Sequence, residues 1–120
     1  MSVNKFILLV EDNELLASLM VTVIGQRTLY NVAHVVDAKS ALEIVEQIEP
    51  DLLILDYRLP DLTGFELYQR IHEVSENENI PTIFTSEEFP SAASSGARTT
   101  RLNKPFALQE FLDTICTLLA

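Results

Sequence analysis

Short runs of apolar residues alternate along the whole chain with segments whose apolar residues recur at helical spacing. The clearest runs are Phe6–Val10 and Leu52–Leu55, which contain no polar side chain. Strands that are apolar on both faces are typical of a parallel sheet that is covered by helices on both sides, because neither face meets water. The alternation therefore predicts a doubly wound α/β domain.

Five strands and four regular helices are expected from this pattern. The expected strands are Phe6–Val10, Val32–Val36, Leu52–Leu55, Pro81–Thr85 and the less apolar Thr99–Asn103. The first expected helix carries the apolar stripe Leu15, Leu16, Leu19, Met20 and Val23 and stops at Gly25. The second carries Ala38, Ala41, Leu42, Val45 and Ile48 and ends before Pro50. The third is expected over Phe65–Val74, and the last carries Leu108, Phe111, Leu112, Ile115 and Leu119. Ser, Ala, Gly and Pro dominate 87–98, so a fifth helix there is expected to be short or irregular.

Composition predicts a single cytoplasmic domain over residues 1–120. The chain is 48% hydrophobic, which is enough for one core, and its single cysteine cannot form an internal disulfide. That residue, Cys116, is expected to be a small buried hydrophobe, and His34 and His72 to be structural or surface residues. The net charge of −10 argues against direct binding of nucleic acid or an anionic membrane.

Polar side chains end the expected strands. Glu11 and Asp12 follow the first strand, Asp56 the third, Ser86 the fourth and Lys104 the fifth. In a doubly wound sheet the working crevice lies beyond the carboxyl ends of the strands, so these side chains are expected to converge there.

Three converging carboxylates repel one another unless a cation is present, so this group of residues indicates a metal site. The ligands are hard oxygens with no histidine or thiolate beside them, which favours Mg²⁺ over zinc. A divalent ion, a lysine and a hydroxyl together suit phosphoryl transfer, in which an aspartate can serve as the covalent acceptor.

At these residues the sequence resembles the receiver domains of two-component signalling, the group that includes the bacterial chemotaxis receiver. The resemblance covers essentially the whole chain. The residues that carry it are Glu11-Asp12, Leu55-Asp56-Tyr57-Arg58-Leu59-Pro60, Gly64, Ser86 and Lys104-Pro105-Phe106. It implies a flavodoxin-like fold of five parallel strands in the order 2-1-3-4-5 with about five helices.

The resemblance also implies a role for each site residue. Asp56 would be the phosphoryl acceptor. Asp12 would bind Mg²⁺ directly and Glu11 largely through water, while Arg58 would add its backbone carbonyl. Ser86 would donate a hydrogen bond to the bound phosphoryl group.

Lys104 would contact the same phosphoryl oxygens, presented by a cis Lys104–Pro105 bond. The donor would be a sensor histidine kinase or phosphotransfer protein, or a small phospho-donor in its absence. The output protein is not indicated. Beyond self-phosphorylation and self-dephosphorylation, no enzymatic activity is expected.

Three features depart from the family pattern. Arg101 stands where the family usually has a tyrosine or phenylalanine that reports phosphorylation. Glu87 follows Ser86 where a small residue is usual, so we expect its bulk and charge to slow or weaken phosphorylation. The interval from Ser86 to Lys104 is shorter than usual by about one helical turn. We therefore expect an altered output surface and a different coupling route that uses Arg101.

Other functions fit less well. A phosphatase of the haloacid-dehalogenase type needs a second acid where Arg58 stands, and the carboxylates of Glu11-Asp12 would repel the phosphate of a flavodoxin-like cofactor. No GxxxxGK motif is present. The alternative that stays open is a receiver-like interaction module that is not phosphorylated, for which Glu87 and Arg101 are the evidence.

Overall fold

The structure is a computed structural model that describes residues 4–75, 79–90 and 98–120. In chain order its elements are β1 (Phe6–Val10), α1 (Glu14–Arg27), β2 (Asn31–Val35), α2 (Ala38–Val45), β3 (Leu52–Asp56), α3 (Gly64–Val74), β4 (Thr82–Ser86), β5 (Thr99–Asn103) and α4 (Leu108–Leu119). All strand pairs are parallel, and the sheet order is β2-β1-β3-β4-β5. The predicted fold class and strand order are confirmed.

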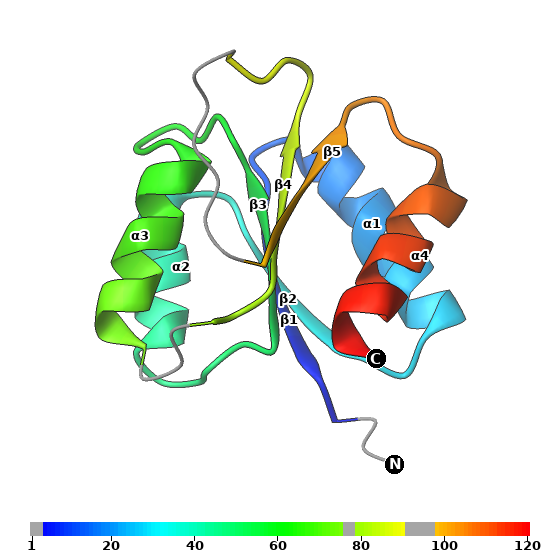
Figure 1. Ribbon diagram of the computed structural model, residues 1–120, viewed down its shortest axis with the longest axis horizontal. Coiled ribbons are helices and arrows are strands. Elements are labelled where there is room, and N and C mark those ends of the chain that lie inside the picture. The colour runs from blue at the N-terminus through cyan, green and yellow to red at the C-terminus, as the bar shows by residue number, and fades with distance from the viewer. Residues whose placement is uncertain (1–3, 76–78, 91–97) are drawn as a thin grey trace.

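Helices cover both faces of the sheet (Figure 1), with α2 and α3 on one side and α1 and α4 on the other. Successive residues of a strand point to opposite faces, so each central strand supplies both cores. The core beside α2 and α3 includes Leu8, Val10, Leu53, Leu55 and Phe84. The core beside α1 and α4 includes Ile7, Leu9, Leu52, Ile54 and Ile83. Burial on both faces explains why β1 and β3 are continuous apolar runs.

The strand register aligns the carboxyl ends of the strands. Val10 of β1 is paired with Leu55 of β3, and Asp56 is paired with Thr85 of β4. One residue further along β4, Ser86 is paired with Asn103 of β5. The polar residues that end the strands are therefore brought to one edge of the sheet.

The helix α1 differs from the prediction in its buried face and in its end. Leu15 is 84% exposed and Leu19 is 47% exposed, whereas Met20 and Ile24 are fully buried. Apolar residues occupy most of this helix, so their spacing alone does not single out one face. Gly25 does not end the helix, which continues to Arg27 and ends at Thr28; the Thr28 backbone N–H and hydroxyl both donate to the Ile24 carbonyl, at 2.9 and 2.7 Å.

Smaller differences concern element ends and the helix count. The strands β2 and β4 are shifted by one residue from the expected ranges, and α2 ends at Val45, which leaves Ile48 55% exposed. The described residues contain four helices. A short or irregular helix was expected within the segment 87–98. Residues 87–90 and 98 are not helical, and the rest of the segment, 91–97, lies outside the described residues.

Two further findings concern the helices. Cys116 is exposed, contrary to the prediction, because α4 buries the face that carries Phe111, Leu112 and Ile115. Within the described ranges, no helix combines the length and the apolar character that crossing a bilayer requires.

Gly64 lies where α3 begins, against the backbone that follows β3. A Cβ atom at this position would collide with the Asp56 carbonyl oxygen and lie 2.9 Å from the Tyr57 Cα atom. The Gly64 N–H also donates to the Tyr57 carbonyl at 2.8 Å. The absence of a side chain at Gly64 therefore allows the loop after Asp56 to fold back closely.

We predict opposite effects of alanine at two glycines. Gly64→Ala should lower the free energy of unfolding by about 2 kcal/mol, because the backbone must shift to admit the methyl group. Gly25→Ala should raise the free energy of unfolding by about 0.5–1 kcal/mol, since nothing lies within 4 Å of the added Cβ and the helix continues past it. Urea denaturation of both variants measures the two changes, and a neutral Gly64→Ala variant would contradict the close approach.

Candidate functional site

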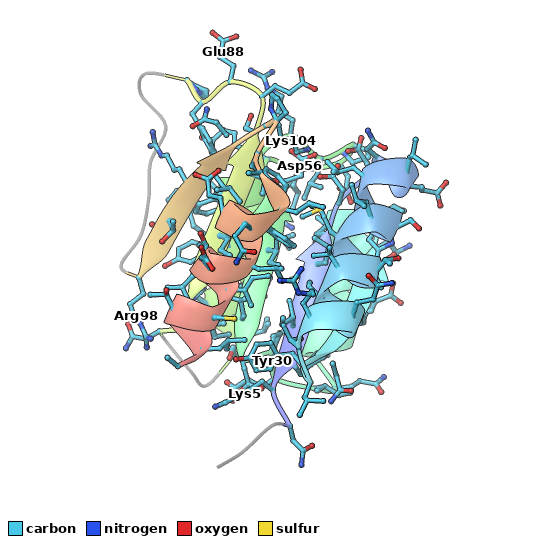
Figure 2. The ribbon with its side chains drawn as sticks, turned by 90° about the vertical axis from the view of Figure 1, so that its right-hand side faces the viewer. Lys5, Tyr30, Asp56, Glu88, Arg98 and Lys104 are labelled. Carbon is cyan, nitrogen blue, oxygen red and sulfur yellow. The ribbon has the colours of Figure 1, made fainter. Side chains whose placement is uncertain are left out.

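A cleft of about 590 Å³ opens at the carboxyl ends of the strands. Its lining residues are Glu11, Asp12, Asn13, Asp56, Arg58, Ser86, Glu87, Glu88 and Lys104. Figure 2 shows Asp56, Lys104 and Glu88 at this end of the sheet and Lys5, Tyr30 and Arg98 at the opposite end. The structure thus brings together all six residues that were predicted to form the site.

Three carboxyl groups meet in the cleft. Glu11 is fully buried and Asp56 is 6% exposed, while Asp12 is exposed at the cleft mouth. One oxygen from each of the three lies within 4.8 Å of the others. This spacing and the all-oxygen donor set fit a hard divalent cation such as Mg²⁺.

Lys104 joins two of these carboxylates. Its Nζ lies 2.8 Å from Oε1 of Glu11 and 3.1 Å from Oδ2 of Asp56. The Lys104 backbone N–H donates to the Ser86 carbonyl at 2.8 Å, and the Lys104–Pro105 bond is cis as expected. The end of β5 therefore places the ammonium group against the carboxylates of Glu11 and Asp56.

The charges in the cleft are not balanced. Burial raises the pKa of Glu11 to about 7, and the neighbouring Asp56 adds to this effect, while the Lys104 ammonium only partly opposes it. Burial by itself would lower the pKa of Lys104, but its hydrogen bond to Glu11 and the charges of both carboxylates raise the pKa above its usual value. One ammonium group among three carboxylates leaves a local excess of negative charge, which a divalent cation would neutralise.

Arg58 and Ser86 complete the cleft wall. The Arg58 N–H donates to Oδ1 of Asp56 at 3.1 Å, so the start of the loop after β3 is tied to the Asp56 carboxylate. Ser86 is 2% exposed; its hydroxyl donates to the Glu88 carbonyl at 2.9 Å and accepts from the Glu88 N–H at 3.3 Å. The Ser86 hydroxyl lines the cleft but is directed at its own loop. Glu87 is exposed beside it.

Arg101 lies over an aromatic ring that sequence reasoning did not single out. Its guanidinium carbon is 5.1 Å from the centre of the Phe89 ring. Phe89 in turn packs edge-on against Tyr57 with 5.6 Å between ring centres, and Tyr57 packs against Phe84 at 6.1 Å. A continuous set of contacts thus runs from the residue after Asp56 to the exposed edge strand β5.

Two further residues hold the loop that carries Glu11. The Asn13 N–H donates to Oε2 of Glu11 at 3.1 Å, and the Asn13 side chain caps α1 by accepting from the Leu16 N–H. His34 Nε2 lies 2.8 Å from the Glu11 carbonyl oxygen, which is a structural role as expected. An asparagine directly before a helical stripe is a capping signal, so the cap could have been predicted from the sequence. The His34 contact depends on the pairing of β1 with β2, so no local sequence pattern predicts it.

We predict that Glu11→Gln makes the protein more stable at alkaline pH. The folded-state pKa of Glu11 lies above its unfolded value, so its stabilising contribution is complete below about pH 4.5 and is lost as the pH rises through about 7. Without divalent metal, the variant should therefore exceed wild type by about 2 kcal/mol at pH 8 and match it at pH 5. Urea denaturation in EDTA tests this, with the exposed Glu43→Gln as control. Equal stability of wild type and Glu11→Gln at both pH values would contradict the raised pKa of Glu11.

Comparison with known proteins places this cleft in a family. The response regulator receiver domain family matches residues 7–116. The polar-differentiation response regulator DivK of Brucella ovis is 27% identical over 116 residues, which cover 93% of this chain and 94% of that protein.

Two solved structures share the fold. The receiver domain of the hybrid histidine kinase CckA is 26% identical with a TM-score of 0.82, covering 96% of this chain and 99% of that one. A receiver domain from a sensor histidine kinase of Pseudomonas aeruginosa PAO1 has a magnesium ion coordinated in its active-site cleft; it is 24% identical with a TM-score of 0.80, covering 97% of this chain and 98% of that one. Sequence and fold agree, and this chain belongs to the response regulator receiver domain family of two-component signalling.

Proposed function

We propose that this receiver domain accepts a phosphoryl group on Asp56 from a sensor histidine kinase or phosphotransfer protein and then changes shape to regulate a partner protein in the cytoplasm. The observation that carries the proposal is the Asp56 carboxylate, which lies in an open cleft 3.1 Å from the Lys104 ammonium and beside Glu11 and Asp12. A nucleophile, a fixed cation and a group of metal ligands are the parts that phosphoryl transfer to a carboxylate requires.

The transfer forms one bond and breaks one. An Asp56 carboxylate oxygen attacks the phosphorus, and the P–N bond of the donor phosphohistidine breaks, with its electron pair returning to the imidazole nitrogen. Lys104 offers its positive charge to the phosphoryl oxygens. For the Ser86 hydroxyl to donate to the phosphoryl group, it must leave the Glu88 carbonyl, so phosphorylation would alter the loop after β4.

Glu11, Asp12, Asp56 and the Arg58 carbonyl would hold Mg²⁺. The Pseudomonas aeruginosa receiver domain, which shares the fold, binds magnesium in its cleft. When bound, this ion supplies positive charge that neutralises the carboxylates and the transferring phosphoryl group. The chain's own enzymatic chemistry is limited to self-phosphorylation from small donors and self-dephosphorylation.

A receiver-like module that is not phosphorylated is the second candidate. It is favoured by Glu87, whose exposed carboxylate lines the cleft next to Ser86 and would repel an incoming phosphoryl group. The buried ion pairs of Lys104 with Glu11 and Asp56 favour the phosphorylated form instead, because they supply a fixed positive charge beside the acceptor.

Incubation with Mg²⁺ and acetyl phosphate should separate these candidates. We expect intact-mass spectrometry to show one added phosphoryl group, which Asp56→Asn abolishes and the exposed surface variant Asp113→Asn retains. Glu87→Ala should accelerate the reaction, since it removes a negative charge from the cleft. A wild-type protein that stays unmodified, alone and with phosphorylated donor proteins, would support the unphosphorylated module.

We also predict that Arg101 and Phe89 are energetically coupled and that the coupling responds to phosphorylation. A double-mutant cycle of Arg101→Ala and Phe89→Leu should give a coupling free energy of about 0.5–1 kcal/mol in the unmodified protein, as for an exposed cation–π pair. Urea denaturation measures the cycle, with and without Mg²⁺ and beryllofluoride as a phosphoryl mimic. An identical coupling in both conditions would remove Arg101 from the switching route.

A further inference from the structure

We propose that Asp61 is a positioning residue for the magnesium site: it clamps the loop between β3 and α3 onto the first turn of α2 and thereby holds the Arg58 carbonyl in place. This inference rests on the proposed metal site and adds a residue that does not line the cleft. Asp61 is exposed, and nothing in its own sequence surroundings indicates a role in binding.

Asp61 binds the start of α2 with both carboxylate oxygens. Oδ1 accepts from the Ala38 N–H at 3.0 Å, and Oδ2 accepts from the Lys39 N–H at 3.1 Å. The helix's own cap, Asp37, accepts from the Ser40 N–H at 2.8 Å. The first N–H groups of a helix have no partner within the helix and favour negative charge. Asp61 satisfies two of them from a loop that lies 23 and 22 residues further along the chain.

Backbone bonds hold the two ends of the loop and close its turn, where the Leu59 N–H donates to the Leu62 carbonyl at 3.3 Å. The Tyr57 N–H donates to the Thr85 carbonyl and the Gly64 N–H to the Tyr57 carbonyl, both at 2.8 Å. Arg58 and Thr63 form an antiparallel bridge within the loop. These bonds tie the ends of the loop to β4 and to each other, whereas Asp61 ties its tip to a different helix.

The helix α2 is a suitable anchor for the tip. Its residues Ala38 and Ala41 are fully buried in the core that includes the β1 and β3 side chains Val10 and Leu55. The strand that precedes Glu11 and the strand that ends at Asp56 therefore pack against the same core as the helix that holds Asp61. A loop fixed at both ends and at its tip keeps the Arg58 backbone in one position relative to the carboxylates.

Loss of the clamp should weaken magnesium binding more than it weakens the fold. Groups that orient a metal ligand typically change metal affinity by about tenfold or more when they are removed. We expect Asp61→Ala to bind Mg²⁺ about tenfold more weakly than wild type. Asp61→Asn keeps one acceptor oxygen, so its Mg²⁺ affinity should lie between those of wild type and Asp61→Ala.

Asp37→Ala is the matched control. Asp37 and Asp61 are both carboxylates that accept backbone N–H groups in the first turn of α2, so removing either destabilises the same helix end and removes the same charge from the same place. Only Asp61 belongs to the loop that contains Arg58. We therefore expect both variants to lower the melting temperature, and Asp37→Ala to change the Mg²⁺ dissociation constant by less than about twofold.

The experiment is a MgCl2 titration of wild type and of each variant, as full chains, in which amide chemical shifts in ¹H–¹⁵N spectra report Mg²⁺ binding. A thermal melt of each protein reports its stability. A tenfold difference between Asp61→Ala and Asp37→Ala supports the clamp. Equal dissociation constants for Asp61→Ala and wild type overturn it, and so does equal weakening by both variants, which would reflect helix stability or charge. If Asp61→Ala does not fold, Asp61→Asn decides: weaker Mg²⁺ binding than both wild type and Asp37→Ala supports the clamp, and a dissociation constant equal to either one overturns it.

A failure of the Asp61 clamp can be distinguished from a failure of the proposed function. Wild-type protein that binds no Mg²⁺ overturns the metal site and the clamp together. Wild-type protein that binds Mg²⁺ but is never phosphorylated on Asp56 overturns the phosphoryl-acceptor function, and the difference between the Asp61 and Asp37 variants still decides the clamp.

Discussion

One ammonium group holds the working end of this domain together. Lys104 Nζ is bonded to both Glu11 and Asp56, which lie 93 and 48 residues earlier in the chain. Burying carboxylates is costly unless a cation pairs with them, and here one cation serves two buried acids while Asp12 lies beside them. Burial raises the pKa of Glu11, Asp56 adds to the effect, and the single ammonium group opposes it only in part. The site is therefore built to take up a cation, because a bound cation relieves a repulsion that the fold itself imposes.

The backbone around this cleft is held by groups other than its three carboxylates and its lysine. His34 lies against the Glu11 carbonyl, Asn13 donates to the Glu11 side chain, and Asp61 spans from the loop after β3 to α2. Each contact joins elements that are separate in sequence or fixes a loop at its exit from a strand. These contacts limit the movement of the groups that would bind a cation. The loops around the cleft therefore do not have to become ordered when a cation binds.

On the far side of the cleft, the chain differs from the usual receiver pattern. Arg101 replaces the expected aromatic residue and lies over Phe89, which contacts Tyr57, the residue after Asp56. The Ser86 hydroxyl is bonded to Glu88, the neighbour of Phe89. Where the family usually has an aromatic residue on β5, the aromatic ring instead lies on the loop after β4. This arrangement gives a path of contacts from Tyr57, the neighbour of Asp56, to the edge strand β5, with a cation–π pair at its outer end.

The sequence by itself determined the sheet, its strand order through family resemblance, and the residues of the cleft. The strands and the convergence of the cleft residues follow from simple rules, because an apolar run predicts a strand buried on both faces and parallel strands end at one edge of the sheet. Only the tertiary structure decided which face of α1 is buried, that Cys116 is exposed, and that Asp61 and Phe89 have partners. These outcomes depend on distances between elements. A helix whose apolar residues are not confined to one face, or a lone exposed aspartate, carries no local signal of what will pack against it.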